Sequence, residues 1–185
     1  MNLFVDCETF SRADLRRVGA HQYARDPSTE LLLVAYQLDD DVLGRGPVVL
    51  WDRATTGPRV PDELRDLLPD PAVTLTAFNA TFEMAIFEAA GVLAFDPSRW
   101  VCVQALALSW GLPASLAGVG DALGFTGARA KASDGQRLIR TFSVPQPKTG
   151  RRIMPQDQMP AWQRFGDYCR QDVVAEREIF SRLSA

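Results

Sequence analysis

The chain has 185 residues, 46% of them hydrophobic, and a formal net charge of −3. These values predict one folded domain over residues 1–185, and they exclude a disordered chain and a protein that binds nucleic acid through a strongly basic overall charge. No stretch approaches the roughly 18 apolar residues of a membrane span, and no basic segment precedes an apolar one at the start. Three widely spaced cysteines fit reduced thiols, so we expect a soluble cytoplasmic protein that makes no membrane contact.

Strand-like runs open the chain, at residues 2–7, 30–38 and 47–51. The second and third runs are joined by an acidic turn at 39–41 and by Gly44. This punctuation predicts that the first three strands form a meander.

The following segments alternate between helix and strand. A short helix is expected at 61–68, a strand at 73–78, a helix at 79–90 that stops at Gly91, and a fifth strand at 100–103. From there the pattern is helical to the end of the chain. Three consecutive strands followed by this alternation predict an α/β fold with a mixed sheet of about five strands flanked by helices.

Two acids interrupt the first apolar run. Asp6 and Glu8 share one face of the expected strand while Cys7 points to the other face. Carboxylates about 7 Å apart on one strand repel each other, and a divalent cation between them would remove that repulsion. The pair therefore indicates half of a metal site, although a polar strand end is the simpler alternative.

Two later segments carry acids at unusual places. Glu83 lies at the edge of the apolar face of its helix, four residues after Asn79, at the end of a strand. An N-cap followed by an exposed acid is the alternative reading of that pair. In the last helix, Asp172 falls on the core-facing side, one turn after Tyr168, where a carboxylate is costly unless it is paired or bound to metal.

Together these patterns resemble the DnaQ-like 3′–5′ exonucleases of the tyrosine-bearing (DEDDy) branch. Their first motif, Asp-x-Glu, matches residues 6–8, the second, an Asn followed by an aromatic and an acid, matches 79–83, and Tyr-x-x-x-Asp matches 168–172. The second motif usually ends in Asp, whereas this chain has Glu83. The resemblance extends to the proofreading exonuclease region of bacteriophage family A DNA polymerases, and it implies a ribonuclease H-like three-layer fold. Similar segments recur there in the same order, at 14–19, 111–116 and 131–138.

The resemblance implies a metal-dependent 3′–5′ exonuclease that releases deoxynucleoside monophosphates from DNA and proofreads for a polymerase. It implies two Mg²⁺ or Mn²⁺ ions per site, ligated by oxygen. By the same resemblance, Asp6 bridges both ions, Glu8 and Asp172 complete the site that activates water, and Glu83 supports the second ion. Tyr168 is expected to orient the attacking water.

The expected substrate is the single-stranded 3′ end of DNA, which aromatic stacking and basic side chains can hold. Residues 125–152 carry seven basic residues against one acid, and they run into a loop at 143–160 that we expect to be mobile. The candidate nucleic-acid contacts are the residues beside the motifs and in this basic stretch: Thr9, Phe10, Asn79, Phe82, Lys131, Arg137 and Arg140.

Two further readings stay open at this point. An RNA-trimming exonuclease of the same branch has the same motifs, and a non-catalytic single-strand-binding or polymerase-docking module could share the fold. In phage polymerases the exonuclease region precedes a polymerase domain of which this chain has no sequence. The expected partner is therefore a DNA polymerase that acts in trans or is encoded in missing sequence, in the host cytoplasm if the chain is phage-encoded.

Overall fold

A computed structural model of the protein describes residues 1–40, 44–125 and 128–184, without the side chains of 128–133. The described residues form one mixed sheet in the order β3-β2-β1-β5-β6, with β4 also paired to β2. One strand more than the sequence predicts is present, because a two-residue strand pairs with the end of β2. The strands are β1 (Asn2–Phe10), β2 (Glu30–Asp40), β3 (Gly44–Arg45), β4 (Val49–Asp52), β5 (Thr74–Ala77) and β6 (Trp100–Cys102).

The strand directions explain how the site is assembled. β1, β2 and β4 form the predicted antiparallel meander, and β5 and β6 run parallel to β1. Phe4 pairs with Thr76, so β5 ends at Ala77 beside the middle of β1. The carboxyl ends of β1 and β5 therefore point the same way, which is where ligands usually bind in α/β sheets.

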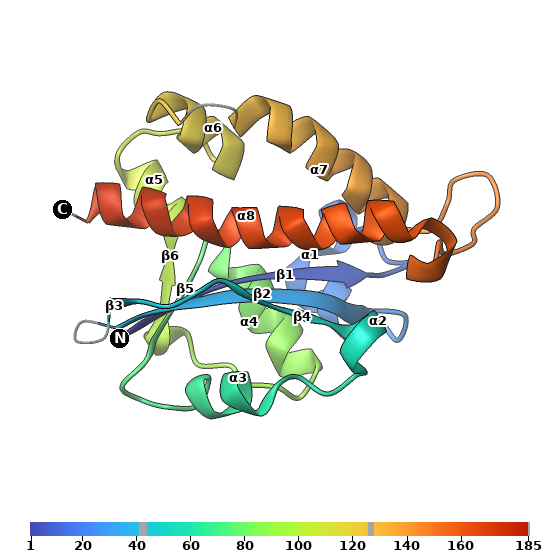
Figure 1. Cartoon of the computed structure of the whole chain (residues 1–185), viewed down its shortest axis with the longest axis horizontal. Helices are drawn as coiled ribbons and strands as arrows, with labels where there is room; N and C mark the ends of the chain where they lie inside the picture. Colours follow the sequence, from blue (N-terminus) through green and yellow to red (C-terminus); the bar gives the residue numbers. More distant parts are fainter. Residues whose placement is uncertain (41–43, 126–127, 185) are drawn as a thin grey trace.

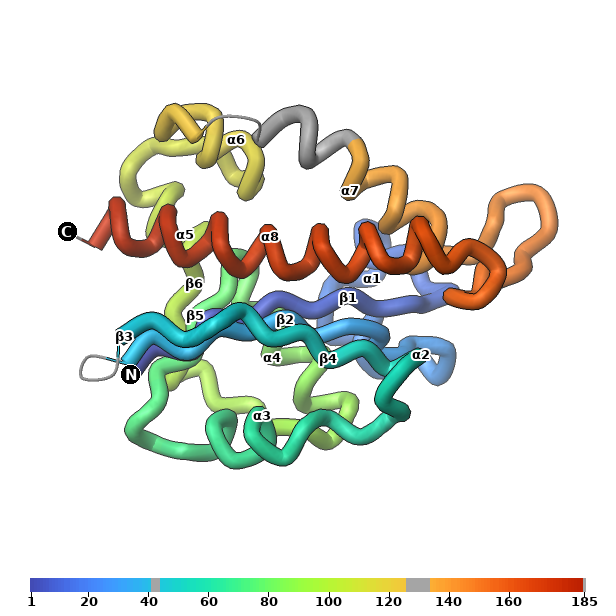
Figure 2. Tube along the Cα trace, viewed as in Figure 1, coloured from blue at the N-terminus to red at the C-terminus, as the bar shows by residue number. Residues whose placement is uncertain are grey.

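Helices cover both faces of the sheet (Figure 1). On one face lie α3 (Asp62–Leu67) and α4 (Ala80–Ala89), with α1 (Leu15–Arg25) packed on α4. The long helix α8 crosses the other face, and the Cα trace in Figure 2 shows α6 and α7 on its outer side. The remaining helices are α2 (Arg53–Thr56), α5 (Val103–Ser109), α6 (Leu116–Ala122), α7 (Ala128–Phe142) and α8 (Met159–Leu183), with 3₁₀ turns η1 (Pro97–Arg99) and η2 (Pro155–Gln158).

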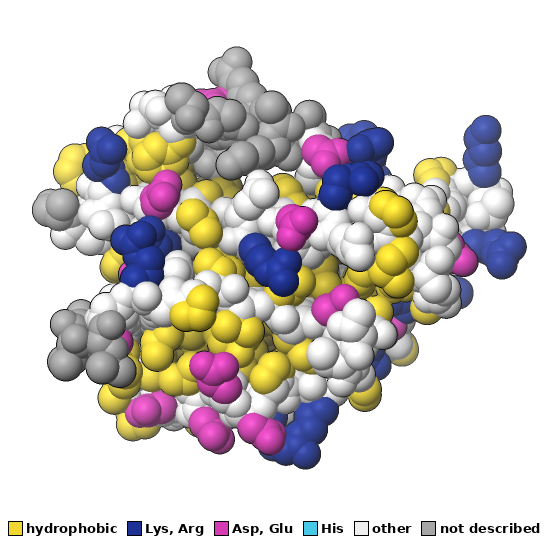
Figure 3. Space-filling view, viewed as in Figure 1, with side chains coloured by type: hydrophobic (Ala, Val, Ile, Leu, Met, Phe, Trp, Pro, Cys, Tyr) yellow, Lys and Arg dark blue, Asp and Glu magenta, His cyan; other side chains and the backbone are white. Residues whose placement is uncertain are grey.

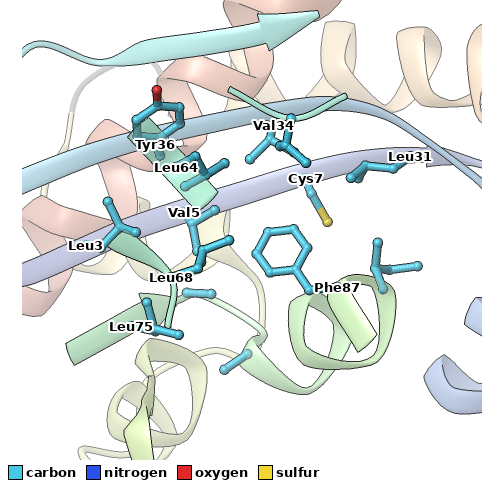
Figure 4. Packing of buried hydrophobic residues seen from close by; sticks show 14 of the residues in the cluster. Leu3, Val5, Cys7, Leu31, Val34, Tyr36, Leu64, Leu68, Leu75 and Phe87 are labelled. Atoms are coloured by element: carbon cyan, nitrogen blue, oxygen red, sulfur yellow. The ribbon is translucent and has the colours of Figure 1, made fainter. Parts of the chain in front are cut away.

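The side chains of β1 alternate between two cores. Leu3, Val5 and Cys7 point into the cluster formed with α3 and α4, where they meet Phe87 (Figure 4). The intervening side chains face α8, where Phe4 belongs to a second cluster. Since strand side chains alternate, Asp6 and Glu8 face α8 as well.

Helix α1 is the main element that the sequence analysis did not anticipate. It is mostly exposed and polar, it buries only Tyr23 and Ala24, and Gly19 interrupts it with a φ of 76°. These features leave no apolar stripe of period 3.6 for a pattern to detect. In the described part of the chain, no helix combines the length and the apolar character that crossing a membrane requires.

Candidate active site

Asp6 and Glu8 lie on the central strand, facing α8. Glu8 is buried, and the Oδ2 atom of Asp6 is buried without a hydrogen-bond partner among the described residues. The β1–β2 register shifts between Glu8 and Thr9, so that Thr9 pairs with Leu31. Irregular pairing of this kind often re-aims side chains next to active sites, and here it follows directly after the second acid.

Glu83 comes from the first turn of α4 and is more deeply buried than its sequence position suggests, at 4% exposure. The Cys7 thiol lies 3.9 Å from its Oε1, while Oε2 has no partner among the described residues. Asn79 occupies the N-cap of α4, but its side chain makes no capping hydrogen bond and is exposed. The N-cap alternative is therefore confirmed for the position of Asn79, whereas the accompanying acid is buried.

Helix α8 contributes Tyr168 and Asp172, one turn apart and both half-buried. Burial, and then the charge of Asp172, raise the pKa of Tyr168, so the phenol lies near the Asp172 carboxylate. The Cys169 thiol lies 3.7 Å from the backbone oxygen of Asp6, so this part of α8 sits directly on β1. These contacts fix the aromatic ring and the acid relative to the central strand.

The ring of Tyr168 packs against the backbone of α7 at Gly135. A Cβ added at Gly135 would lie 2.1 Å from Cε2 of Tyr168. Only glycine fits there without a shift of the ring or of the helix. Gly135 is therefore part of the site, although it carries no functional group.

The acids share one electrostatic environment. Burial raises the pKa of Asp6 from 3.8 to about 6. Burial, and then the charge of Asp6, raise the pKa values of Glu8, Glu83 and Asp172 well above their ordinary range. Each carboxylate thus lies close enough to Asp6 to be affected by its charge. The structure brings together the four acids that the sequence analysis selected.

A fifth buried carboxylate, Glu176, belongs to the same group. It is 1% exposed, and burial and the charges of Asp6, Glu83 and Asp172 raise its pKa. Glu176 is not among the residues predicted from the sequence, because the motifs end at Asp172. One signal was present, since Glu176 follows Asp172 by four residues and so falls on the same core-facing side of the helix.

The donor set fits a hydrated divalent cation. Within the described residues, no three acidic, cysteine or histidine side chains lie close enough together to hold one metal ion directly. However, Asp6 and Glu83 each have a buried oxygen without a partner among those residues, and the acids are oxygen donors only. Mg²⁺ takes one or two carboxylates and keeps several of its waters, which suits this wider spacing.

The predicted nucleic-acid contacts divide into exposed and buried residues. Phe10 is 5% exposed in the core, with the Arg152 guanidinium 4.6 Å above its ring, and Thr9 is buried in a 2.8 Å hydrogen bond to Tyr23. Neither side chain reaches the surface, as stacking on a base or contact with a nucleic-acid strand would require. The second core covers the face of β1 that carries Phe10, and Tyr23 covers Thr9. Phe82 is half-buried, with its ring centroid 5.9 Å from that of Tyr23.

The basic candidates lie on α7. Arg137 and Arg140 are exposed, and Arg137 is paired with Asp134 at 2.5 Å. Lys131 is on the same helix, but its side chain lies outside the described residues. Figure 3 shows Lys and Arg side chains along α8 and on the projecting α7–α8 loop, while acids gather along the edge formed by α3. In the same view acids also lie among the basic side chains along α8, and a basic group lies beside the acids at the α3 edge, so the two charges alternate on this face.

Comparison with known proteins relates the chain to a DNA polymerase and to a nuclease. No protein-family model matches the chain. A solved structure described as the apo form of the nuclease has a TM-score of 0.51 and 15% identity, covering 99% of this chain and 71% of that one, which is a likeness of fold. The chain is 39% identical over 187 aligned positions to a DNA polymerase of Bacillus phage SP02, an alignment that covers 98% of this chain. The chain spans 28% of the length of that polymerase, so it is homologous to one part of a phage DNA polymerase.

Proposed function

We propose that the chain is a metal-dependent 3′–5′ exonuclease that removes deoxynucleoside monophosphates from the 3′ end of DNA and proofreads for a DNA polymerase. The main support is the group of four carboxylates with Tyr168 on β1, α4 and α8, in the chain order of the DEDDy branch. The ribonuclease H-like assignment of the fold is part of this proposal, and the sheet order and the nuclease-like fold support it. The homology to a phage DNA polymerase supports the link to replication.

Asp6, Glu8, Glu83 and Asp172 would hold two Mg²⁺ or Mn²⁺ ions, in part through the water molecules that the ions keep. Bound divalent ions supply a nucleophile at neutral pH and stabilise charge on the attacking and leaving oxygens. The chain itself holds several carboxylates in one buried region from which water is partly excluded. This burial raises their pKa values. Their repulsion is the driving force for taking up cations.

Tyr168 serves as a hydrogen-bond donor in this proposal. Burial and the neighbouring charge of Asp172 raise its pKa far above the ordinary value of a phenol, so the hydroxyl is protonated at neutral pH. A protonated phenol cannot take a proton from water. It can orient a water molecule by donating its proton, while the backbone at Gly135 confines its ring.

The substrate would approach as a single strand, since a paired 3′ end cannot enter a site between a sheet and a helix. Asn79 and Phe82, which come shortly before Glu83 at the start of α4, would contact the strand, and Arg137 and Arg140 on α7 would contact phosphates. Lys131 remains a proposal from the sequence. The polymerase partner would lie in the same polypeptide or act in trans.

Digestion of single-stranded DNA tests the proposal. A 5′-labelled oligonucleotide is incubated with Mg²⁺ or Mn²⁺, with EDTA, and with the Asp6→Ala protein, and the products are resolved on a gel. The expected result is a ladder that shortens from the 3′ end only with metal and intact Asp6. Asp66→Ala is the matched control, because Asp66 is an exposed acid on α3, on the opposite face of the sheet.

The other outcomes separate the remaining readings. Digestion of an RNA of equal sequence at a higher rate than DNA would replace the substrate with RNA. Binding of single strands with no digestion of either polymer would indicate a non-catalytic module. Full activity of Asp6→Ala would contradict the assignment of the carboxylate group as the site.

A further inference from the structure

Glu176 lies outside the three motifs but inside the carboxylate group. It is on α8, one turn after Asp172, and only 1% of its side chain is exposed. Its pKa is raised first by burial and then by the charges of Asp6 and Glu83, so it lies near acids from β1 and α4. A fifth buried acid increases the repulsion in the group, which requires an explanation.

One oxygen of Glu176 joins α8 to the junction of β5 and α4. Its Oε2 accepts a hydrogen bond of 2.8 Å from the backbone N–H of Phe78. Phe78 follows the last residue of β5 and precedes Asn79, the N-cap of α4. The backbone oxygen of Phe78 in turn accepts from the N–H of Gln104 at 2.8 Å. Glu176 therefore fixes the start of the helix that carries Glu83 relative to the helix that carries Asp172.

The other oxygen has no such use. Oε1 is buried and has no hydrogen-bond partner among the described residues, as is the case for one oxygen of Asp6 and one of Glu83. A buried carboxylate oxygen without a partner is costly. Accepting one backbone N–H does not require a charge, because a glutamine carbonyl would do the same without repelling the neighbouring acids. The free oxygen points to a positively charged ligand.

We propose that Glu176 is a fifth carboxylate of the divalent-cation site, which positions the β5–α4 junction through Oε2 and offers Oε1 to the hydration shell of a bound cation. This inference rests on the proposed function, because it assumes that the group binds cations. It assigns to Glu176 a positioning role and a share of the negative charge, and no contact with the scissile phosphate.

Calorimetric titration with Mn²⁺ tests this role without any activity measurement. The proteins compared are the unaltered chain of residues 1–185, Glu176→Gln, Glu178→Gln and Asp172→Asn. Glu176→Gln keeps an acceptor for the Phe78 N–H and replaces the other, charged oxygen with a neutral NH₂ group. Glu178→Gln is the matched control, since Glu178 is an exposed acid two residues further along the same helix.

The expected result is that Glu176→Gln weakens Mn²⁺ binding about ten-fold or more, the effect typical of groups that support metal ligands. Glu178→Gln should bind as the wild type does. Unchanged Mn²⁺ affinity in Glu176→Gln, with binding lost in Asp172→Asn, would overturn the role of Glu176 and leave the proposed function standing. Unchanged affinity in Asp172→Asn as well would overturn the cation site itself.

A second variant keeps the test decisive if Glu176→Gln does not fold. Glu176→Asp retains the charge but shortens the reach to Phe78. Mn²⁺ affinity within about three-fold of the wild type would support the charge as the contribution of this residue. Removal of a group that supports a metal ligand typically lowers metal affinity about ten-fold or more. A loss as large as that of Asp172→Asn would overturn the proposal, because the charge would then be insufficient.

Discussion

Tyr168 is the residue whose environment limits its chemistry most narrowly. Burial and the nearby charge of Asp172 raise its pKa, which keeps the proton on the hydroxyl oxygen. The ring has no freedom on the side of Gly135. A side chain held in this way can orient a reactant but cannot act as a base.

The first prediction concerns the hydroxyl alone. Tyr168→Phe keeps the ring and its packing but removes the hydroxyl that would orient the attacking water. We expect turnover of single-stranded DNA to fall about ten-fold or more, as for other positioning groups, with little change in KM. Steady-state digestion of an oligonucleotide measures both constants, and a change confined to KM would contradict the orienting role.

At the scale of elements, the contact between α7 and α8 decides the geometry of the site. The two helices approach closely because α7 presents Gly135, which has no side chain, to the ring of Tyr168. The register of α7 therefore determines where the phenol lies. A helix far from the acidic motifs in sequence thus becomes part of the catalytic arrangement that we propose.

A methyl group at this contact should act through the tyrosine. In Gly135→Ala the new Cβ would lie 2.1 Å from Cε2 of Tyr168, so the ring or the helix must shift. We expect turnover to fall on the order of ten-fold or more, because small misplacements of positioning groups have effects of this size. Gln136→Ala is the matched control, since Gln136 is the exposed neighbour on the same helix.

The double variant identifies the cause of that loss. If Gly135→Ala acts by displacing the phenol, it should add little to the loss already produced by Tyr168→Phe. Turnover is measured for both single variants and for the combination, together with the thermal unfolding midpoint of each. If the loss of turnover in the double variant equals the product of the losses in the two single variants, the alanine does not act through the Tyr168 phenol.

At the scale of the whole molecule, the buried acids link stability to pH. Folding raises the pKa of Asp6 from 3.8 to about 6, so the folded state binds the proton more tightly than the unfolded state does. The resulting stabilisation is complete below the unfolded value and is lost as the pH rises through about 6. Glu8, Glu83 and Asp172 shift in the same direction and add to this loss.

Thermal unfolding in EDTA should show this dependence. We expect the thermal unfolding midpoint of the wild type to fall as the pH is raised from about 4 to about 7. The midpoint of Asp6→Asn should fall less over the same range, because one of the titrating acids is absent. Mg²⁺ should raise the wild-type midpoint most at the higher pH, where the carboxylates are ionised. Parallel curves for the two proteins would be the contrary result.

Local periodicity was sufficient to predict a large part of the fold and the faces on which the acids of the motifs lie. Alternation along a strand placed Asp6 and Glu8 on one face, and the β1 register confirms it. Helical periodicity placed Asp172 toward the core, where it is half-buried and close enough to Asp6 for the charge of Asp6 to raise its pKa. These positions follow from the geometry of one element, which its own residues determine. The polar helix α1 and the two-residue strand β3 were missed because neither buries an apolar stripe.

Only the tertiary structure revealed the contacts of Glu176, Gly135 and Phe10. The partner of Glu176 lies 98 residues earlier in the chain, at the end of β5. Gly135 is significant only because the ring of Tyr168 packs on it, and Phe10 is withdrawn from solvent by the core and by Arg152. Such contacts join residues that no local pattern connects. The chain's own residues therefore determine which side chains can share a face, whereas the packing of elements determines which of them meet.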